Sequence, residues 1–165
     1  MEPYRTFLIT GATRGIGRAL SDKLSGQGHL VVGIARHVDA GFPGVLYTAD
    51  LSSADETRVV LLKITENHEI HGIVNNVGVA LPQQLGNIDI QTFLNVMDIN
   101  VRVAVQITQA LVSNMKSRGW GRIVNVCSRA IFGATDRTAY AAAKSALVGC
   151  TRTWEIGRAS CRERV

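Results

Sequence analysis

A glycine-rich segment near the amino terminus restricts the possible fold of this chain more than any other feature. The segment, 10–17, reads Thr-Gly-Ala-Thr-Arg-Gly-Ile-Gly. An apolar stretch of β character precedes it at 4–9, and Ile16, Leu20 and Leu24 follow at helical spacing. The glycines therefore lie where a strand turns into a helix. Glycine permits a tight turn, and a helix N-terminus offers free N–H groups, so we interpret the segment as a phosphate-binding turn rather than an ordinary glycine-rich loop.

The rest of the sequence alternates between strand and helix patterns, which is typical of an α/β domain with a parallel sheet. Strands are expected at 6–10, 29–36, 44–49, 72–76 and 122–127. Helices are expected at 16–26, 54–66, 89–96, 101–116 and from 138 towards 154. Right-handed crossovers then predict a Rossmann-type doubly wound sheet with the strand order 3-2-1-4-5. The ligand crevice of such a sheet lies beyond the carboxyl ends of its first and fourth strands.

Length and composition fit one soluble domain without a membrane span. The chain has 165 residues, 46% hydrophobic and 19% charged, and no apolar run approaches membrane-spanning length. The short segment before the first strand leaves no room for a signal peptide, so we expect a cytoplasmic protein. The net charge of +5 is scattered, which argues against nucleic-acid binding. Cys127, Cys150 and Cys161 lack metal-ligand or disulfide spacing, so no metal site is predicted and the first two are expected to be buried thiols.

The end of the second expected strand bears on which dinucleotide could bind. An Asp or Glu there bonds the adenosine ribose and favours NAD. This chain has Ala35-Arg36 instead, and a guanidinium suits a 2′-phosphate. Arg14, within the glycine-rich turn, could approach the same phosphate, so the two arginines predict NADP(H) unless both are merely surface charges. Asp50 could accept a hydrogen bond from adenine while Leu51 packs against the ring, or Asp50 could simply be an acid at a helix start.

A second pattern, Tyr140-Ala-Ala-Ala-Lys144, lies in the last expected helix. The i, i+4 spacing places the two side chains on one helix face. A lysine ammonium beside a phenol lowers the pKa of the phenol and makes it a usable acid or base. The pattern alone is weak, but Ser128 ends the fifth strand and Asn100 lies in the helical region after the fourth.

Together these motifs resemble those of the short-chain dehydrogenase/reductase family. The likeness extends from about Tyr4 to Trp154 and rests on 10–17 (TGxxxGIG), Asp50, 75–78 (similar to NNAG, with Val77 in place of alanine), Asn100, Ser128 and 140–144. The resemblance implies hydride transfer between NADP(H) and a small-molecule carbonyl or secondary alcohol, with a 3-oxoacyl thioester as the first candidate. A non-catalytic dinucleotide-binding protein is the alternative. Homo-oligomers are usual in the family, so we expect the parent protein to form one.

The resemblance also implies roles for individual residues. Tyr140 would exchange a proton with the substrate oxygen, and Lys144 would hold the nicotinamide ribose and lower the pKa of Tyr140. Ser128 would bind the substrate oxygen, and Asn100 would hold a water that relays protons to solvent. The residues expected to bind the cofactor are Gly11, Thr13, Arg14, Gly15, Ile16, Gly17, Arg36, Asp50, Leu51, Asn76, Val77, Gly78, Tyr140 and Lys144.

The sequence departs from the family after Trp154. Residues 155–165 look like an in-frame translation of a sequencing-library adapter, the alternative being a genuine basic tail. We therefore expect residues 1–154 to form a truncated NADP(H)-binding domain and 155–165 to be a non-native tail. The last two strands of the family would be missing, which would expose the edge of the fifth strand and remove one wall of the substrate pocket. Such a fragment is expected to be poorly stable and to have little or no reductase activity.

Overall fold

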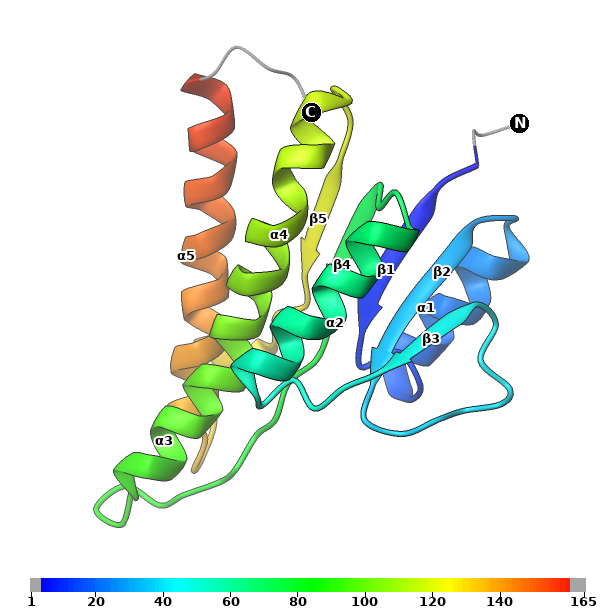
Figure 1. Ribbon diagram of the computed structural model, residues 1–165. Coiled ribbons are helices and arrows are strands. Elements are labelled where there is room, and N and C mark those ends of the chain that lie inside the picture. Colours follow the sequence, from blue (N-terminus) through cyan, green and yellow to red (C-terminus); the bar gives the residue numbers. More distant parts are fainter. Residues whose placement is uncertain (1–3, 161–165) are drawn as a thin grey trace.

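A five-stranded parallel sheet forms the centre of the computed structural model, which describes residues 4–160 (Figure 1). The strands are β1 (Thr6–Thr10), β2 (Leu30–Ala35), β3 (Val45–Thr48), β4 (Gly72–Asn75) and β5 (Arg122–Asn125). Their order, β3-β2-β1-β4-β5, is the predicted one. The helices are α1 (Gly15–Gly26), α2 (Ala54–Asn67), α3 (Ile90–Met97), α4 (Val103–Ser117) and α5 (Thr138–Ser160).

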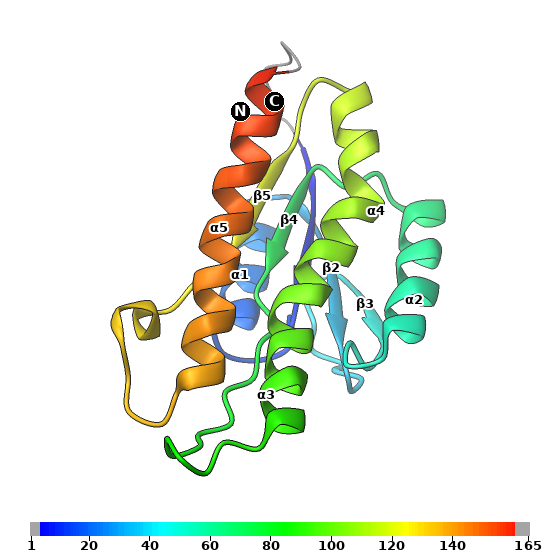
Figure 2. The same ribbon diagram turned by 90° about the vertical axis from the view of Figure 1, so that its left-hand side faces the viewer.

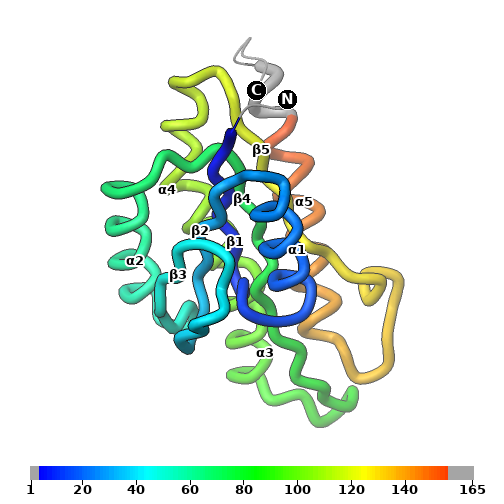
Figure 3. The backbone as a smooth tube through the Cα atoms, turned by 90° about the vertical axis from the view of Figure 1, so that its right-hand side faces the viewer, coloured from blue at the N-terminus to red at the C-terminus, as the bar shows by residue number. Residues whose placement is uncertain are grey.

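Helices cover both faces of the sheet, and each face has its own apolar core. On one side, α2 and α4 bury Ile64, Ile107 and Leu111 against Leu8 and other strand residues. On the other side, α1 packs against a smaller cluster of buried strand residues. Figure 3 shows α1 on the opposite side of the strands from α2 and α4. Because the chain leaves β1 towards one face and β4 towards the other, the ends of these two adjacent strands separate and leave an opening between them.

The helices after β4 differ from the prediction. We expected two helices with a break near 97–100, but a π-helical turn (Asp98–Arg102) joins α3 directly to α4. Figure 2 shows α3 and α4 as one continuous run beside α5. The segment contains no glycine or proline to end a helix, so the chain stays helical and absorbs one extra residue in the wider turn. A short 3₁₀ helix (Arg129–Phe132) was also not predicted.

The outer edge of the sheet carries a second correction. β5 is an edge strand, and Val124 on it is 51% exposed. Cys127 is exposed and Cys150 only partly buried, so the expectation that both are buried is wrong. Cys127 follows the edge strand, where no further strand of the described chain covers it.

α5 continues to Ser160, and residues 161–165 of the predicted non-native tail lie outside the described residues. No helix in the described part of the chain is long and apolar enough to cross a membrane.

The side chain of Thr10 connects β1 to β4 at the point where they separate. Its hydroxyl oxygen accepts hydrogen bonds from the backbone N–H groups of Asn76, at 3.0 Å, and Val77, at 2.9 Å. Thr10 is fully buried, so water cannot replace these bonds. The two N–H groups belong to residues just beyond the end of β4, where the sheet no longer offers partners.

We therefore expect Thr10→Val to lower the free energy of unfolding by about 2–4 kcal/mol, because it leaves two buried N–H groups without an acceptor. Thr10→Ser keeps the oxygen and should cost only about 1 kcal/mol for the lost methyl group. Urea unfolding followed by circular dichroism measures both values. A loss in Thr10→Val no larger than that in Thr10→Ser would contradict the role assigned to the hydroxyl oxygen.

Candidate active site

The glycine-rich turn has the conformation that its sequence predicts. Gly11 and Gly15 have φ values of +64° and +53°, in the left-handed region that other residues rarely adopt. A Cβ atom on Gly17 would lie 2.2 Å from the carbonyl oxygen of Gly11, so any larger residue would push α1 away from β1. The side-chain amide of Asn76 donates to the carbonyls of Thr10, at 2.8 Å, and Gly11, at 3.3 Å. The turn is therefore held between α1 and the end of β4.

The N-terminus of α1 at this turn is free to bind an anion. Its N-cap residue, Arg14, makes no side-chain capping bond, and the first turn contains no acidic residue. Ile16 in that turn is exposed. The N–H groups and the positive end of the helix dipole thus remain available to a negatively charged ligand.

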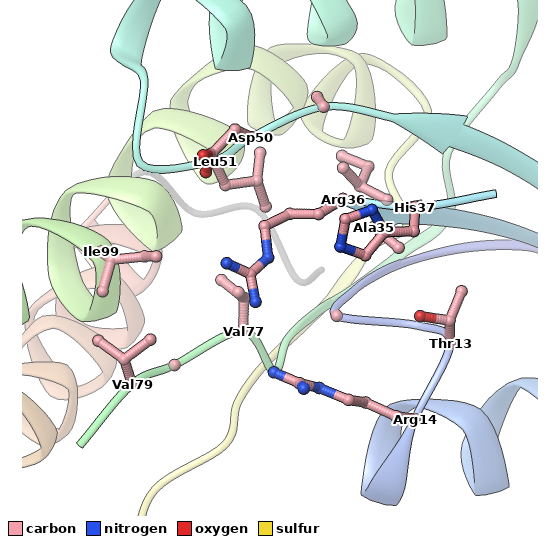
Figure 4. Close-up of a pocket in the computed structure, with 14 residues that line it drawn as sticks. Thr13, Arg14, Ala35, Arg36, His37, Asp50, Leu51, Val77, Val79 and Ile99 are labelled. Carbon is pink, nitrogen blue, oxygen red and sulfur yellow. The ribbon is translucent and has the colours of Figure 1, made fainter. Parts of the chain in front are cut away.

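A cleft opens beyond the carboxyl ends of the first four strands (Figure 4). Eight of the predicted cofactor residues line it: Gly11, Thr13, Arg14, Arg36, Asp50, Leu51, Val77 and Gly78. The sequence prediction missed Ile34, Ala35, His37, Ala49, Val79 and Ile99, which also line it. The position of His37 directly after Arg36 was the only signal that could have identified it. Ile99 comes from the π-helical turn and could not be placed without the fold.

The charges around the cleft are unevenly distributed. In Figure 4, the side chains of Arg14 and Arg36 reach towards one another from opposite sides of the opening. Neither arginine takes part in any ion pair between described residues. The nearby carboxylate of Asp39 is bound instead by Arg18, at 2.7 Å, and by the backbone N–H of Gly41, at 3.0 Å. Two arginines without a carboxylate partner favour a ligand with a compact negative charge.

Asp50 is bound to its own loop. Its carboxylate accepts hydrogen bonds from the backbone N–H and the hydroxyl of Ser52, at 2.9 and 2.8 Å. These bonds, and to a smaller extent the charge of Arg36, hold the pKa of Asp50 below its usual value. Ser53 caps α2 by accepting a hydrogen bond from the N–H of Glu56. Asp50 therefore orders the loop before α2, and its predicted contact with adenine stays a prediction.

Lys144 and Asn100 are buried side by side next to Gly78. Each is 2% exposed. The ammonium of Lys144 donates to the carbonyl of Val126 at 2.9 Å, and burial lowers its pKa, with the neighbouring Cys127 acting in the opposite direction. A Cβ atom on Gly78 would lie 2.5 Å from Oδ1 of Asn100 and 3.3 Å from Nζ of Lys144. The two polar atoms thus face the same small space, which exists because residue 78 is glycine.

Asn100 has one unused polar atom. Its side-chain amide donates to the carbonyls of Val79, at 2.9 Å, and Val96, at 2.8 Å. Its oxygen, Oδ1, is buried and has no hydrogen-bond partner among residues 4–160. A buried acceptor of this kind normally binds a water molecule or a ligand.

Tyr140 lies next to Lys144 on α5, as its spacing predicts. Nζ of Lys144 is 5.6 Å from the centre of the Tyr140 ring. Ser128 follows β5, and its hydroxyl accepts a hydrogen bond from the N–H of Ala130 at 3.2 Å, which caps the 3₁₀ helix that packs against α5. The structure therefore brings Asn100, Tyr140 and Lys144 together. No direct hydrogen bond joins Ser128 to any of these three described residues, and all four predicted roles stay predictions.

The burial of Lys144 predicts a pH dependence of stability. Between its lowered pKa and the ordinary value of 10.5, the unfolded chain binds more protons than the folded chain, so stability rises with pH. Two chains are compared, one with Cys127→Ser alone and one with both Cys127→Ser and Lys144→Met. We expect the free energy of unfolding of the first to increase relative to that of the second as the pH is raised from about 7 towards 10.5. The serine removes the thiol whose charge would otherwise act on Lys144. Urea unfolding at several pH values measures the difference, and the same change at exposed Lys116 should show no trend.

The comparisons with known proteins agree on one family. A model of the family described as short chain dehydrogenase matches residues 5–160. The 3-oxoacyl-acyl-carrier-protein reductase of Haemophilus influenzae is 30% identical over 158 residues, which cover 88% of this chain and 64% of that protein. The NADPH-dependent pterin aldehyde reductase of Arabidopsis thaliana is 32% identical, with coverages of 90% and 66%. The chain thus spans slightly less than two thirds of the length of these relatives.

Solved structures show the same fold. A short-chain dehydrogenase from Streptomyces avermitilis superposes with a TM-score of 0.89 at 24% identity, covering 97% of this chain and 62% of that one. A putative NAD(P) dependent gluconate 5-dehydrogenase from Beutenbergia cavernae with bound NADP has a TM-score of 0.87 at 28% identity, with coverages of 94% and 67%. Because the family match extends over most of the sequence and the strand order is that of the solved relative, the chain belongs to the short-chain dehydrogenase family.

Proposed function

We propose that this chain binds NADP(H) and carries the catalytic groups of an oxidoreductase that acts on a carbonyl or secondary alcohol. The observation that carries the choice of cofactor is the pair of arginines, Arg14 and Arg36, which reach into the cleft without a carboxylate partner. Asp39, the acid closest in sequence to the position that favours NAD, is engaged by Arg18. The name of the Arabidopsis relative and the NADP bound to a solved relative support the same choice.

The described residues fit such a cofactor along its length. The 2′-phosphate would bind between Arg14 and Arg36, and the adenine would lie between Leu51 and Ile99, which both line the cleft. The pyrophosphate would bind at the free N-terminus of α1, where Gly17 allows close approach of the backbone. When bound, the nicotinamide would supply or accept the hydride.

The buried groups next to Gly78 would manage the proton. Oδ1 of Asn100 is an unused buried acceptor, and a water bound there would lie near Nζ of Lys144. Lys144 would hold the ribose hydroxyls and, through its charge, favour the ionised form of the Tyr140 phenol, which would exchange a proton with the substrate oxygen. The hydroxyl of Ser128 would orient that oxygen. Tyr140 would thus act as the acid or base, and the other three residues would serve position and electrostatics.

The substrate class is proposed from the relatives. Several relatives near 30% identity are 3-oxoacyl-acyl-carrier-protein reductases, while others reduce a pterin aldehyde or L-xylulose by name. A carbonyl group is common to these names, and a 3-oxoacyl thioester is our first candidate. For the 165-residue chain itself we propose cofactor binding with little or no turnover, since the edge of β5 is uncovered. The alternative function is that of a non-catalytic dinucleotide-binding protein.

The cofactor choice is tested by replacing the arginine at the end of β2. We expect Arg36→Leu to weaken NADPH binding by about 10- to 100-fold, because a charge-assisted bond to the 2′-phosphate is lost, and to change NADH binding by less than about twofold. Fluorescence titration of both cofactors measures the two affinities. Arg58→Leu, at an exposed position on α2, is the matched control and should change neither. Equal loss of NADPH and NADH affinity in Arg36→Leu would contradict a 2′-phosphate site.

The catalytic proposal needs a separate measurement. The 165-residue chain is mixed with NADPH and an acetoacetyl thioester, and NADPH absorbance is followed. Binding in the titration with no loss of absorbance agrees with the proposed low turnover, whereas oxidation at ordinary enzyme rates would refute it. The parent function is decided in a chain of full family length: wild type should turn over, and Tyr140→Phe should bind NADPH normally but lose at least about 10²-fold in rate. A full-length wild type that binds without turnover would favour the non-catalytic alternative.

A further inference from the structure

The side chain of Arg102 forms several hydrogen bonds, two of them to backbone carbonyls about fifty positions away in the sequence. It is the last residue of the π-helical turn, two residues after Asn100. Its guanidinium donates to both carboxylate oxygens of Asp98, each at 2.7 Å, and to the side-chain oxygen of Gln106 at 2.8 Å. Only 24% of the side chain is exposed. These bonds fix the guanidinium in one orientation on the surface of its own helix.

From that orientation, Arg102 reaches the loop between β3 and α2. It donates to the backbone carbonyls of Leu51, at 2.7 Å, and Ser52, at 3.2 Å. Gln106, one turn further along α4, donates to the carbonyl of Ala54 at 2.9 Å. The contacts cross about fifty positions of sequence, and all three accept through the backbone. The loop is thus tied to the helix whatever its side chains are.

The loop that Arg102 holds forms one wall of the cleft. Asp50 and Leu51 line the cleft, and Leu51 is 4% exposed, packed against the core. Ile99 also lines the cleft, and it belongs to the same π-helical turn as Arg102. One short segment therefore places Ile99 at the cleft, Asn100 beside Lys144, and Arg102 on the loop.

We infer that Arg102 is a positioning residue: it holds the 50–52 loop in register with the π-helical turn, and so fixes the adenine end of the cleft relative to Asn100. This inference rests on the proposed function, in that the cleft must bind an adenine dinucleotide. It does not depend on whether the dinucleotide is NADP(H) or NAD(H), because Arg102 acts on the adenine wall, whereas the choice between the two is assigned to Arg14 and Arg36. Arg102 does not itself line the cleft.

Affinity measurements on matched arginine variants test the inference. Arg102→Met keeps the length and apolar part of the side chain but removes every donor, and Arg102→Lys keeps one charge. The control is Arg118→Met: its side chain is 22% exposed, it is paired with Glu69, and it donates to the carbonyl of Ile70, at the opposite end of the sheet from the cleft. The probes are 2′,5′-ADP and 5′-AMP, which contain adenine but no nicotinamide, with Kd measured by calorimetry.

We expect Arg102→Met to weaken both probes by about tenfold, Arg102→Lys to recover part of that loss, and Arg118→Met to leave both within about twofold. Urea unfolding of the two methionine variants shows whether their stabilities fall by similar amounts. Equal weakening of both probes by Arg118→Met would reduce the effect to general destabilisation and overturn the inference. Unchanged affinity in Arg102→Met would overturn it as well.

Amide hydrogen exchange gives a readout that stability alone would not change. In the wild type, 5′-AMP should slow exchange in 50–52 and also in 98–103, which the nucleotide does not need to cover. In Arg102→Met, protection of the glycine-rich turn should remain while protection of 98–103 is lost. Protection of 98–103 that persists in Arg102→Met would contradict the link.

A failure of the proposed function looks different. If 2′,5′-ADP binds the wild type no more tightly than 5′-AMP, the choice of NADP(H) is wrong, but the 5′-AMP measurements still decide the role of Arg102. If neither probe binds the wild type, the adenine-binding cleft is wrong, and the inference falls with it.

Discussion

The site depends on how two parallel strands are held together where they separate. Adjacent strands β1 and β4 send the chain to opposite faces of the sheet, so the backbone ladder between them stops at the pair Ile9 and Val74. Groups beyond β4 donate to the end of β1 instead: the hydroxyl oxygen of Thr10 accepts from two backbone N–H groups, and the side-chain amide of Asn76 donates to the carbonyl of Thr10. With no backbone ladder left at this level, side chains alone fix the distance between the glycine-rich turn and Gly78. The glycine-rich turn and Gly78, two parts of the proposed cofactor site, are therefore placed relative to each other by these bonds.

The proposed preference of the cleft for NADP(H) rests on electrostatics. The turn before α1 and the end of β2 each contribute an arginine, and the acids nearby are bound elsewhere: Asp39 to Arg18 and Asp50 to Ser52. Two like charges facing one opening repel each other in the free protein, at a modest cost while both are solvated. An anion placed between them removes that repulsion and gains charge-assisted bonds. The arrangement is therefore better explained by a ligand than by the stability of the free chain.

Local patterns predicted the parts of the fold that local chemistry decides. β1 and the start of α5 lie where the sequence predicts them, because the apolar runs and glycines that define such elements act within a few residues. The π-helical turn could not be predicted, since no residue type marks it; Val96 and Val103, on either side of it, are both buried. The burial of Cys127 was predicted wrongly, because the sequence does not show whether another strand covers the chain at the end of β5. The eight cleft residues were predictable from strand ends, whereas Ile99 and Arg102 act through contacts made across about fifty residues.

The π-helical turn explains why Asn100 is suited to its proposed role. A π-turn shifts the backbone partner of a carbonyl from the fourth residue to the fifth, and the side-chain amide of Asn100 binds the carbonyl of Val96, four residues back. A second bond to Val79 uses the remaining amide hydrogen, so Oδ1 is the only polar atom left to face Gly78 and Lys144. An acceptor fixed in this way loses little rotational freedom when it binds water. The irregularity of the helix, which no local pattern reveals, thus orients the acceptor on which the proposed proton relay would depend.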